Sequence, residues 1–346
     1  MKELTTGVSI QLITDMIGRK AFTEGYNAVS YEATKKLIQR LNNLNFENID
    51  EKERDNYMKF IQNLDTWLLW AREQGYLCEF QREALVDLYF MLSEGASCNI
   101  PLEKNIAEHY FCYVFAKVLY FHLETYMEQH GEADKYEALQ ITLSRFDIWS
   151  SDEDYRKACN PMTGCLDYLG SWFKDVNPLI KYWESKIDSK GSNETPIEIK
   201  SAFKRWKNGK VPSWALVKIF FQKDMEPPKE FYIDDEDITE KGFRCFQSIL
   251  IEAYLLVNLF DSLKKQHILS PESCKMIKDG VRLYYREVFV TRNPEHCDYS
   301  VDIEQEAKSN LMFRTLYCIL EGGLSEISEF DFLKSGFINP EFPMVL

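Results

Sequence analysis

Residues 195–223, TPIEIKSAFKRWKNGKVPSWALVKIFFQK, hold the clearest local folding signals in the chain. Thr195 as N-cap, Pro196 at the first helical position and Glu198 three residues after the cap predict a helix that begins with a capping box. Gly209 predicts its end, because glycine readily adopts the left-handed conformation that terminates helices. The stretch therefore predicts a helix followed by a tight turn.

This predicted helix is amphipathic. Its apolar residues recur at the i, i+3, i+4, i+7 spacing of a buried stripe, and they are Ile199, Ala202, Phe203 and Trp206. At about 100° per residue, Lys200, Lys204 and Lys207 fall together on a flank beside that stripe. We expect one side of the helix to dock into a core while the flank presents cations.

A second helix is predicted to begin at Pro212 and Ser213. Its apolar residues are Trp214, Val217, Phe220 and Phe221. We expect these side chains to pack back against the first helix. The two segments together predict a helical hairpin with a basic surface.

Basic charge is concentrated in residues 195–223 of an otherwise acidic protein. Seven basic residues stand against the single acid Glu198, a formal charge of +6 within a chain of −14. The candidate nucleic-acid-binding residues are Lys200, Lys204, Arg205, Lys207 and Lys210. A solvated basic face without a partner is the alternative interpretation of the same pattern.

The same stretch resembles the second half of a lambda-repressor/Cro-type helix-turn-helix domain. Its recognition helix ends in a Trp-x-x-Gly element and its next helix starts with Pro-Ser, as in residues 206–209 and 212–213 here. Lys207 stands where the family usually has Glu, and the Gly-to-Pro spacing is one residue short. The Gln-x-x-Leu-Ala start of the family's second helix is also missing. The resemblance implies DNA binding, with earlier helices at residues 164–175 and 178–188.

Length and charge limit the possible functions of the whole chain. A chain of 346 residues with 45% hydrophobic and 14% aromatic residues is long and apolar enough for two or three folded domains. A net charge of −14 argues against a general affinity for nucleic acid or anionic membranes. Any nucleic-acid binding must therefore be local.

The cysteines and the N-terminus indicate a reducing compartment. Nine cysteines are an odd number, and no Cys-x-x-Cys pair occurs among them, which favours reduced core thiols. The first 20 residues lack the uninterrupted apolar run of a signal peptide. No segment is recognised as a membrane span of roughly 20 apolar residues. We expect a cytoplasmic protein without a membrane partner.

Apolar residues recur with a period of 3.6 through most of the chain, and β-branched alternation is scarce, so the predicted fold class is all-α. Before the basic segment, helices are expected at residues 30–43, 51–73, 80–93, 102–129 and 133–149. After it, helices are expected at residues 238–266, 270–290 and 303–321.

Two interruptions of this pattern predict domain boundaries. The first comprises residues 150–154 (SSDED) with the following Asn160-Pro161, and the second comprises residues 224–237. We therefore expect an N-terminal helical bundle over residues 1–150, a helix-turn-helix-like basic module over 155–224 and a C-terminal bundle over 236–346.

Catalytic signatures are scarce. Phosphate-binding loops, dinucleotide fingerprints, nucleophile elbows and His-Glu-x-x-His pairs are absent from the sequence, so we predict no metal, no cofactor and no catalytic residues. His109, His122 and His130 lie too far apart around one helix to share a metal. One exception is Arg292 with His296, which resembles the Arg-polar-x-x-x-His motif of HEPN-type ribonucleases, although its spacing is one residue short.

Three functions follow as alternatives. The first is a regulatory nucleic-acid-binding protein whose basic module is flanked by sensing or recruiting helical domains. The second is a helical interaction or scaffold protein whose basic face meets an acidic partner. The third is a helical ribonuclease. Salt-dependent DNA binding would support the first function. Capture of a partner without DNA would support the second, and RNA cleavage that depends on His296 would support the third.

Overall fold

The computed structural model describes residues 6–24, 50–77, 160–188, 198–233, 239–265, 271–292 and 310–320, with a few isolated helical positions between 36 and 116. Every named element in this part of the chain is an α-helix or a short 3-10 helix. The sole extended pairing found there is an isolated bridge between Phe173 and Tyr232. The all-α fold class is confirmed.

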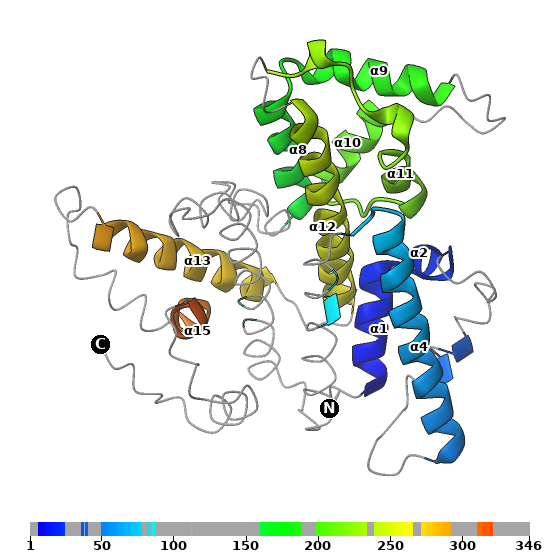
Figure 1. Cartoon of the computed structure of the whole chain (residues 1–346). Coiled ribbons are helices and arrows are strands. Elements are labelled where there is room, and N and C mark those ends of the chain that lie inside the picture. The colour runs from blue at the N-terminus through cyan, green and yellow to red at the C-terminus, as the bar shows by residue number, and fades with distance from the viewer. Residues whose placement is uncertain are drawn as a thin grey trace.

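Figure 1 shows these elements in chain order. They are α1 (Thr6–Ile17), α2 (Arg19–Glu24), α4 (Glu51–Glu73), α8 (Pro161–Trp172), α9 (Val176–Asp188), α10 (Ile199–Lys207), α11 (Trp214–Ile219), η2 (Lys223–Met225), η3 (Lys229–Phe231), α12 (Thr239–Lys265), α13 (Pro271–Arg292) and α15 (Leu311–Leu320).

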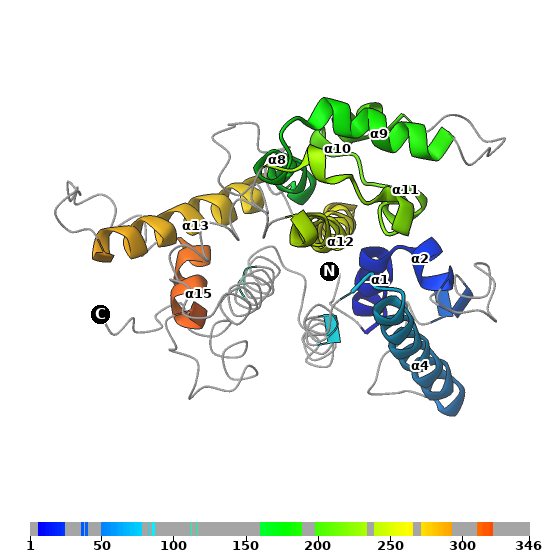
Figure 2. The same cartoon turned by 45° about the horizontal axis from the view of Figure 1, so that its top comes forward.

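Helix α12 is a central element of the described structure. It has 27 residues, which makes it about 40 Å long. It packs against α1, α8 and α11. In Figure 2, where α12 is seen nearly end-on, α8 lies above it and α11 and α1 lie to its right. Buried residues of all these elements form one hydrophobic core.

The same helix has the length and composition of a membrane span, which inspection of the sequence missed. The segment Gly242–Lys265 is long and apolar enough to cross a membrane, and 67% of its most apolar stretch is buried inside the protein. The central helix of a helical bundle has these properties too. The absence of a membrane partner stays a prediction.

Helix α1 was not anticipated from the sequence. Its residues Ile10, Ile13 and Ile17 are buried against the core, at helical spacing. The helix ends at Gly18, whose φ of 84° lies in the left-handed region. The hydroxyl of Tyr254 on α12 donates a hydrogen bond of 3.0 Å to the carbonyl oxygen of Ile17. The end of α1 is therefore fixed directly to α12.

Helix α4 occupies the predicted range 51–73. It begins at a capping box in which the carboxylate of Asp50 accepts from the Glu53 N–H at 2.6 Å and the carboxylate of Glu53 accepts from the Asp50 N–H at 3.2 Å. Such a box satisfies two backbone donors that the first turn would leave unpaired. The indole N–H of Trp67 donates to the carbonyl of Ala21 at 2.9 Å, which attaches α4 to α2.

The predicted C-terminal helices correspond to α12, α13 and α15, and residues 303–309 of the third predicted range lie outside the described residues. The helices α13 and α15 cross closely, because a Cβ on Gly280 would lie 2.6 Å from the Cβ of Met312. The expected helices at 30–43, 80–93, 102–129 and 133–149 fall almost entirely outside the described residues. His109, His122 and His130 lie outside them too.

The predicted domain boundaries remain a prediction. Asn160 is the N-cap residue of α8, and residues 150–159 before it lie outside the described residues. Two 3-10 turns, η2 and η3, lie between α11 and α12, at the second interruption. Helix α12 was assigned to the C-terminal bundle. It packs on α1 from the N-terminal bundle and on α8 from the basic module, so one core joins described parts of all three.

Candidate nucleic-acid interface

Helix α10 is anchored by its apolar stripe as predicted. Ile199, Ala202, Phe203 and Trp206 are all buried. The ring of Phe203 lies 6.0 Å from the ring of Phe220, which follows α11, in a stacked arrangement. The predicted packing of the second helix on the first is thereby confirmed at Phe220.

Trp183 of α9 joins this anchor to the rest of the core. Its side chain is fully buried, and its indole N–H donates to the carbonyl of Met225 at 2.8 Å. Its ring lies 5.0 Å from Phe220 and 5.7 Å from Phe246 of α12. Buried aromatic rings contribute large apolar areas and fixed geometry. The basic helix is therefore held on a rigid aromatic support.

The C-terminal end of α10 agrees with the prediction. Gly209 has a φ of 79°, the left-handed conformation expected of a helix stop. The side-chain amide of Asn160 donates to the carbonyls of Trp206 at 3.0 Å and Lys207 at 3.2 Å. Asn160 is the N-cap residue of α8. The Trp206 carbonyl also accepts from the Gly209 N–H at 2.9 Å, so the amide of Asn160 adds a second donor there and supplies one to the Lys207 carbonyl at the helix end.

The N-terminal end of α10 corrects the predicted capping box. The helix begins at Ile199, and Glu198 is itself the N-cap residue with φ −80° and ψ 95°, rather than the third residue of the helix. Its carboxylate accepts from the hydroxyl of Ser201 at 2.6 Å. The N–H of Lys200 donates instead to the carboxylate of Glu184 on α9 at 3.2 Å. Thr195 and Pro196 lie outside the described residues.

The second helix also differs in part from the prediction. Ser213 is the N-cap residue of α11, as expected. The ring of Trp214 packs on Tyr76 at 5.1 Å and Tyr254 at 5.7 Å, and its indole N–H donates to Glu24 at 2.7 Å. Trp214 was expected to pack on α10, but its ring contacts are with residues before and after the module.

All five predicted nucleic-acid-binding residues are exposed, namely Lys200, Lys204, Arg205, Lys207 and Lys210. Lys200, Lys204 and Lys207, called the cationic flank below, lie within about 60° of one another around α10. Arg205 lies about 100° from Lys204 on the other side. Lys210 follows the stop at Gly209. The structure therefore brings three of the five onto one helical face.

Acidic side chains of the protein border this flank. Lys207 forms an ion pair with Asp167 of α8, and the carboxylate of Glu184 contacts the backbone of Lys200. Lys218 of α11 pairs with Glu24. Among the described residues, the side chains of Lys200 and Lys204 form no ion pair. These two residues are thus the flank members that are ready to bind an external anion.

The spacing of α9 and α10 bears on the helix-turn-helix resemblance. Helices α8 and α9 occupy the positions that the resemblance requires. Residues 189–197, between α9 and α10, lie outside the described residues. Helix-turn-helix motifs use a turn of about 3–4 residues. The resemblance stays a prediction, and the cationic flank is interpreted without it.

The weaker catalytic alternative gains no geometric support from the described residues. Arg292 is the last residue of α13, and His296 lies outside them. No group of three His, Cys, Asp or Glu in the described ranges converges as a metal site. Cys165 is a buried thiol outside any disulfide, and burial raises its pKa well above its usual range. A buried neutral thiol of this kind is chemically inert.

Comparison with known proteins adds no assignment, because no protein-family model, curated protein or solved structure matches the chain. The cationic flank is therefore interpreted from its own chemistry.

Proposed function

We propose that this chain binds duplex DNA through the cationic flank of α10 and acts as a regulatory nucleic-acid-binding protein. The observation that carries the proposal is a helix whose apolar stripe is buried while its lysines are exposed side by side on one flank. The backbone of such a helix is anchored in the core while its lysine side chains face the solvent. Clustered lysines contact phosphates and release counterions, which favours binding.

The geometry favours contacts with the phosphate backbone. Lys200 and Lys207 are separated by about 10 Å along the helix axis. Lys204 lies between them, and Lys210 extends the positive surface past the helix end. Lysine is a flexible point charge, so it positions the protein on phosphates but carries little sequence information. The flank therefore supports DNA affinity more directly than it supports base recognition.

The long helix α12 supports the regulatory part of the proposal. It contacts α8, which lies beside α10, and also contacts α1 near the N-terminus. A change in the flanking helical regions would reach the basic helix through this shared core. We assign the sensing or recruiting role to those flanking regions.

Binding of a random-sequence duplex, followed by fluorescence anisotropy, tests the proposal. The double variant Lys200→Gln/Lys204→Gln should bind more weakly than the unaltered protein, because neither side chain is engaged in an ion pair with another described residue. The control is Lys59→Gln/Lys264→Gln, which removes two exposed charges from α4 and α12. Equal binding by the double variant and the unaltered protein would contradict the proposal.

An acidic protein partner is a second candidate, favoured by the ion pairs that lysines of the module form. Two lysines of the module already pair with carboxylates in the folded protein. These pairs are Lys207 with Asp167 and Lys218 with Glu24. Surface pairs of this kind are worth little individually, so a partner would need several acidic groups. Capture of an acidic partner after nuclease treatment, lost in Lys200→Gln/Lys204→Gln, would favour this function over DNA binding.

A further inference from the structure

An open groove of about 430 Å³ lies between three segments that are distant in sequence. Its walls come from the turn after α4, from residues 221–226 around η2 and from the start of α12. Sites for small ligands have volumes of about 300–1,000 Å³. The cationic flank does not contribute to its lining, so this groove is a separate feature of the molecule.

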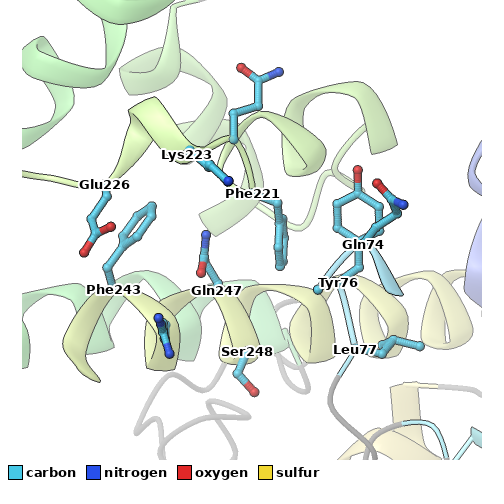
Figure 3. Close-up of a pocket in the computed structure, with 12 residues that line it drawn as sticks. Gln74, Tyr76, Leu77, Phe221, Lys223, Glu226, Phe243, Gln247 and Ser248 are labelled. Atoms are coloured by element: carbon cyan, nitrogen blue, oxygen red, sulfur yellow. The ribbon is translucent and has the colours of Figure 1, made fainter. Parts of the chain in front are cut away.

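One end of the groove is aromatic. Tyr76 and Phe221 meet with ring centroids 5.0 Å apart and planes at 80°, which makes an apolar corner. Aromatic rings favour a further ring in an edge-to-face or offset arrangement. In Figure 3, Tyr76 and Gln74 lie toward one end, Phe243 and Glu226 lie toward the other, and Phe221, Lys223 and Gln247 lie between them.

The polar groups of the groove favour a single negative charge. Lys223, Arg244 and Glu226 line it and are exposed, and among the described residues none of the three side chains forms an ion pair. Two cations against one carboxylate leave a charge of +1. The amide of Gln247 donates one N–H to the carbonyl of Phe220 at 2.7 Å. Its second N–H is a further donor, because a side-chain amide has two.

From this combination we propose that the groove is a binding site for a small aromatic monoanion. Its ring would pack in the Tyr76–Phe221 corner, and its anionic group would lie near Lys223, within reach of the Gln247 amide. Arg244 would add attraction from the opposite wall, while Glu226 disfavours a second negative charge. The proposal stands on groove residues alone and does not depend on DNA binding.

Two fluorescent probes with similar rings and different charge test this site. Anilinonaphthalene sulfonate is an aromatic monoanion, and N-phenylnaphthylamine is its close neutral analogue. We expect saturable binding of both, since both rings fit the aromatic corner. In Lys223→Gln/Arg244→Gln, affinity for the sulfonate should fall about three- to tenfold because two exposed charge contacts are lost. Affinity for the neutral probe should change by less than about twofold, since the apolar corner is intact.

The control variant Lys229→Gln/Lys264→Gln removes two exposed cations that do not line the groove. It should bind both probes as the unaltered protein does. Circular dichroism of each variant at the assay temperature checks that the helices are retained. Absence of saturable sulfonate binding would overturn the proposal. The proposal would also be overturned if the control variant lost as much sulfonate affinity as Lys223→Gln/Arg244→Gln does. It would be overturned too if Lys223→Gln/Arg244→Gln lost affinity for both probes equally.

Discussion

Gly18 is a residue at which the fold depends on the absence of a side chain. Its φ is 84°, and a Cβ there would lie 2.3 Å from the hydroxyl oxygen of Tyr254. That hydroxyl donates the bond to Ile17 that joins α12 to α1. A substitution at Gly18 therefore combines backbone strain with the loss of a buried hydrogen bond.

We predict that Gly18→Ala lowers the free energy of unfolding by about 2–3 kcal/mol, from left-handed strain plus one lost hydrogen bond. Gly75→Ala is the matched control, because Gly75 has a φ of 74° with no atom within 4 Å of an added Cβ. It should cost only about 1 kcal/mol from strain. Urea denaturation measures both, and equal losses would show that the Tyr254 contact contributes nothing.

Asp167 limits the charge that Lys207 offers to an external anion. Replacing it with asparagine removes the ion pair and leaves Lys207 exposed. We predict that Asp167→Asn strengthens DNA binding and steepens the dependence of log affinity on log salt by up to about 0.9, the value of one added phosphate contact. The control Asp65→Asn removes the same charge from α4. An equal gain in DNA affinity in this control would indicate a general effect of net charge.

At the scale of elements, α10 shows which features the sequence predicts well. Its buried stripe and the stop at Gly209 are local patterns, and both are confirmed. Its N-terminal end was misplaced, because the carboxylate of Glu184 from α9 binds the N–H of Lys200 in place of a local cap. The ring contacts of Trp214 were missed for a similar reason, since Tyr76 and Tyr254 come from distant segments. Local signals cannot indicate such partners.

Trp206 carries a prediction about the stability of this element. Its side chain is buried and lies 5.3 Å from the ring of Phe203. Trp206→Ala should lower the free energy of unfolding by roughly 3–5 kcal/mol, the usual cost of removing a large aromatic side chain from a core. Thermal unfolding followed by circular dichroism measures the loss. An unchanged melting temperature would show that α10 is not anchored through this residue.

At the scale of the molecule, α12 joins segments that the sequence assigned to different domains. Its apolar pattern predicted a helix of the C-terminal bundle, but the pattern alone cannot show which helices cover it. The contacts of α12 with α1 and α8 join segments that are distant in sequence, so no local pattern indicates them. The groove beside Tyr76 was missed for the same reason, because its walls come from three separate segments. Its charged and aromatic residues have no shared sequence motif.

Two buried tyrosines, Tyr254 and Tyr232, predict a loss of stability at alkaline pH. Burial raises the pKa of Tyr254 and of Tyr232, so the folded state keeps their protons where the unfolded chain releases them. Their contribution to stability is complete below about pH 10, the ordinary tyrosine pKa, and is lost as pH rises beyond it. Urea denaturation between about pH 8 and pH 10.5 should show the fall. Tyr254→Phe should show a smaller fall, and an equal one would exclude Tyr254 as a cause.

The salt dependence of DNA affinity tests the central claim most directly. The cationic flank should neutralise phosphates, and each contact contributes about 0.9 to the slope of log affinity against log salt. We predict that Lys200→Gln/Lys204→Gln flattens this slope by about 1.8 when anisotropy is measured from about 50 to 200 mM salt. The control Lys59→Gln/Lys264→Gln should keep the original slope. Detectable binding with an unaltered slope in the flank variant, or no binding by the unaltered protein, would contradict the account.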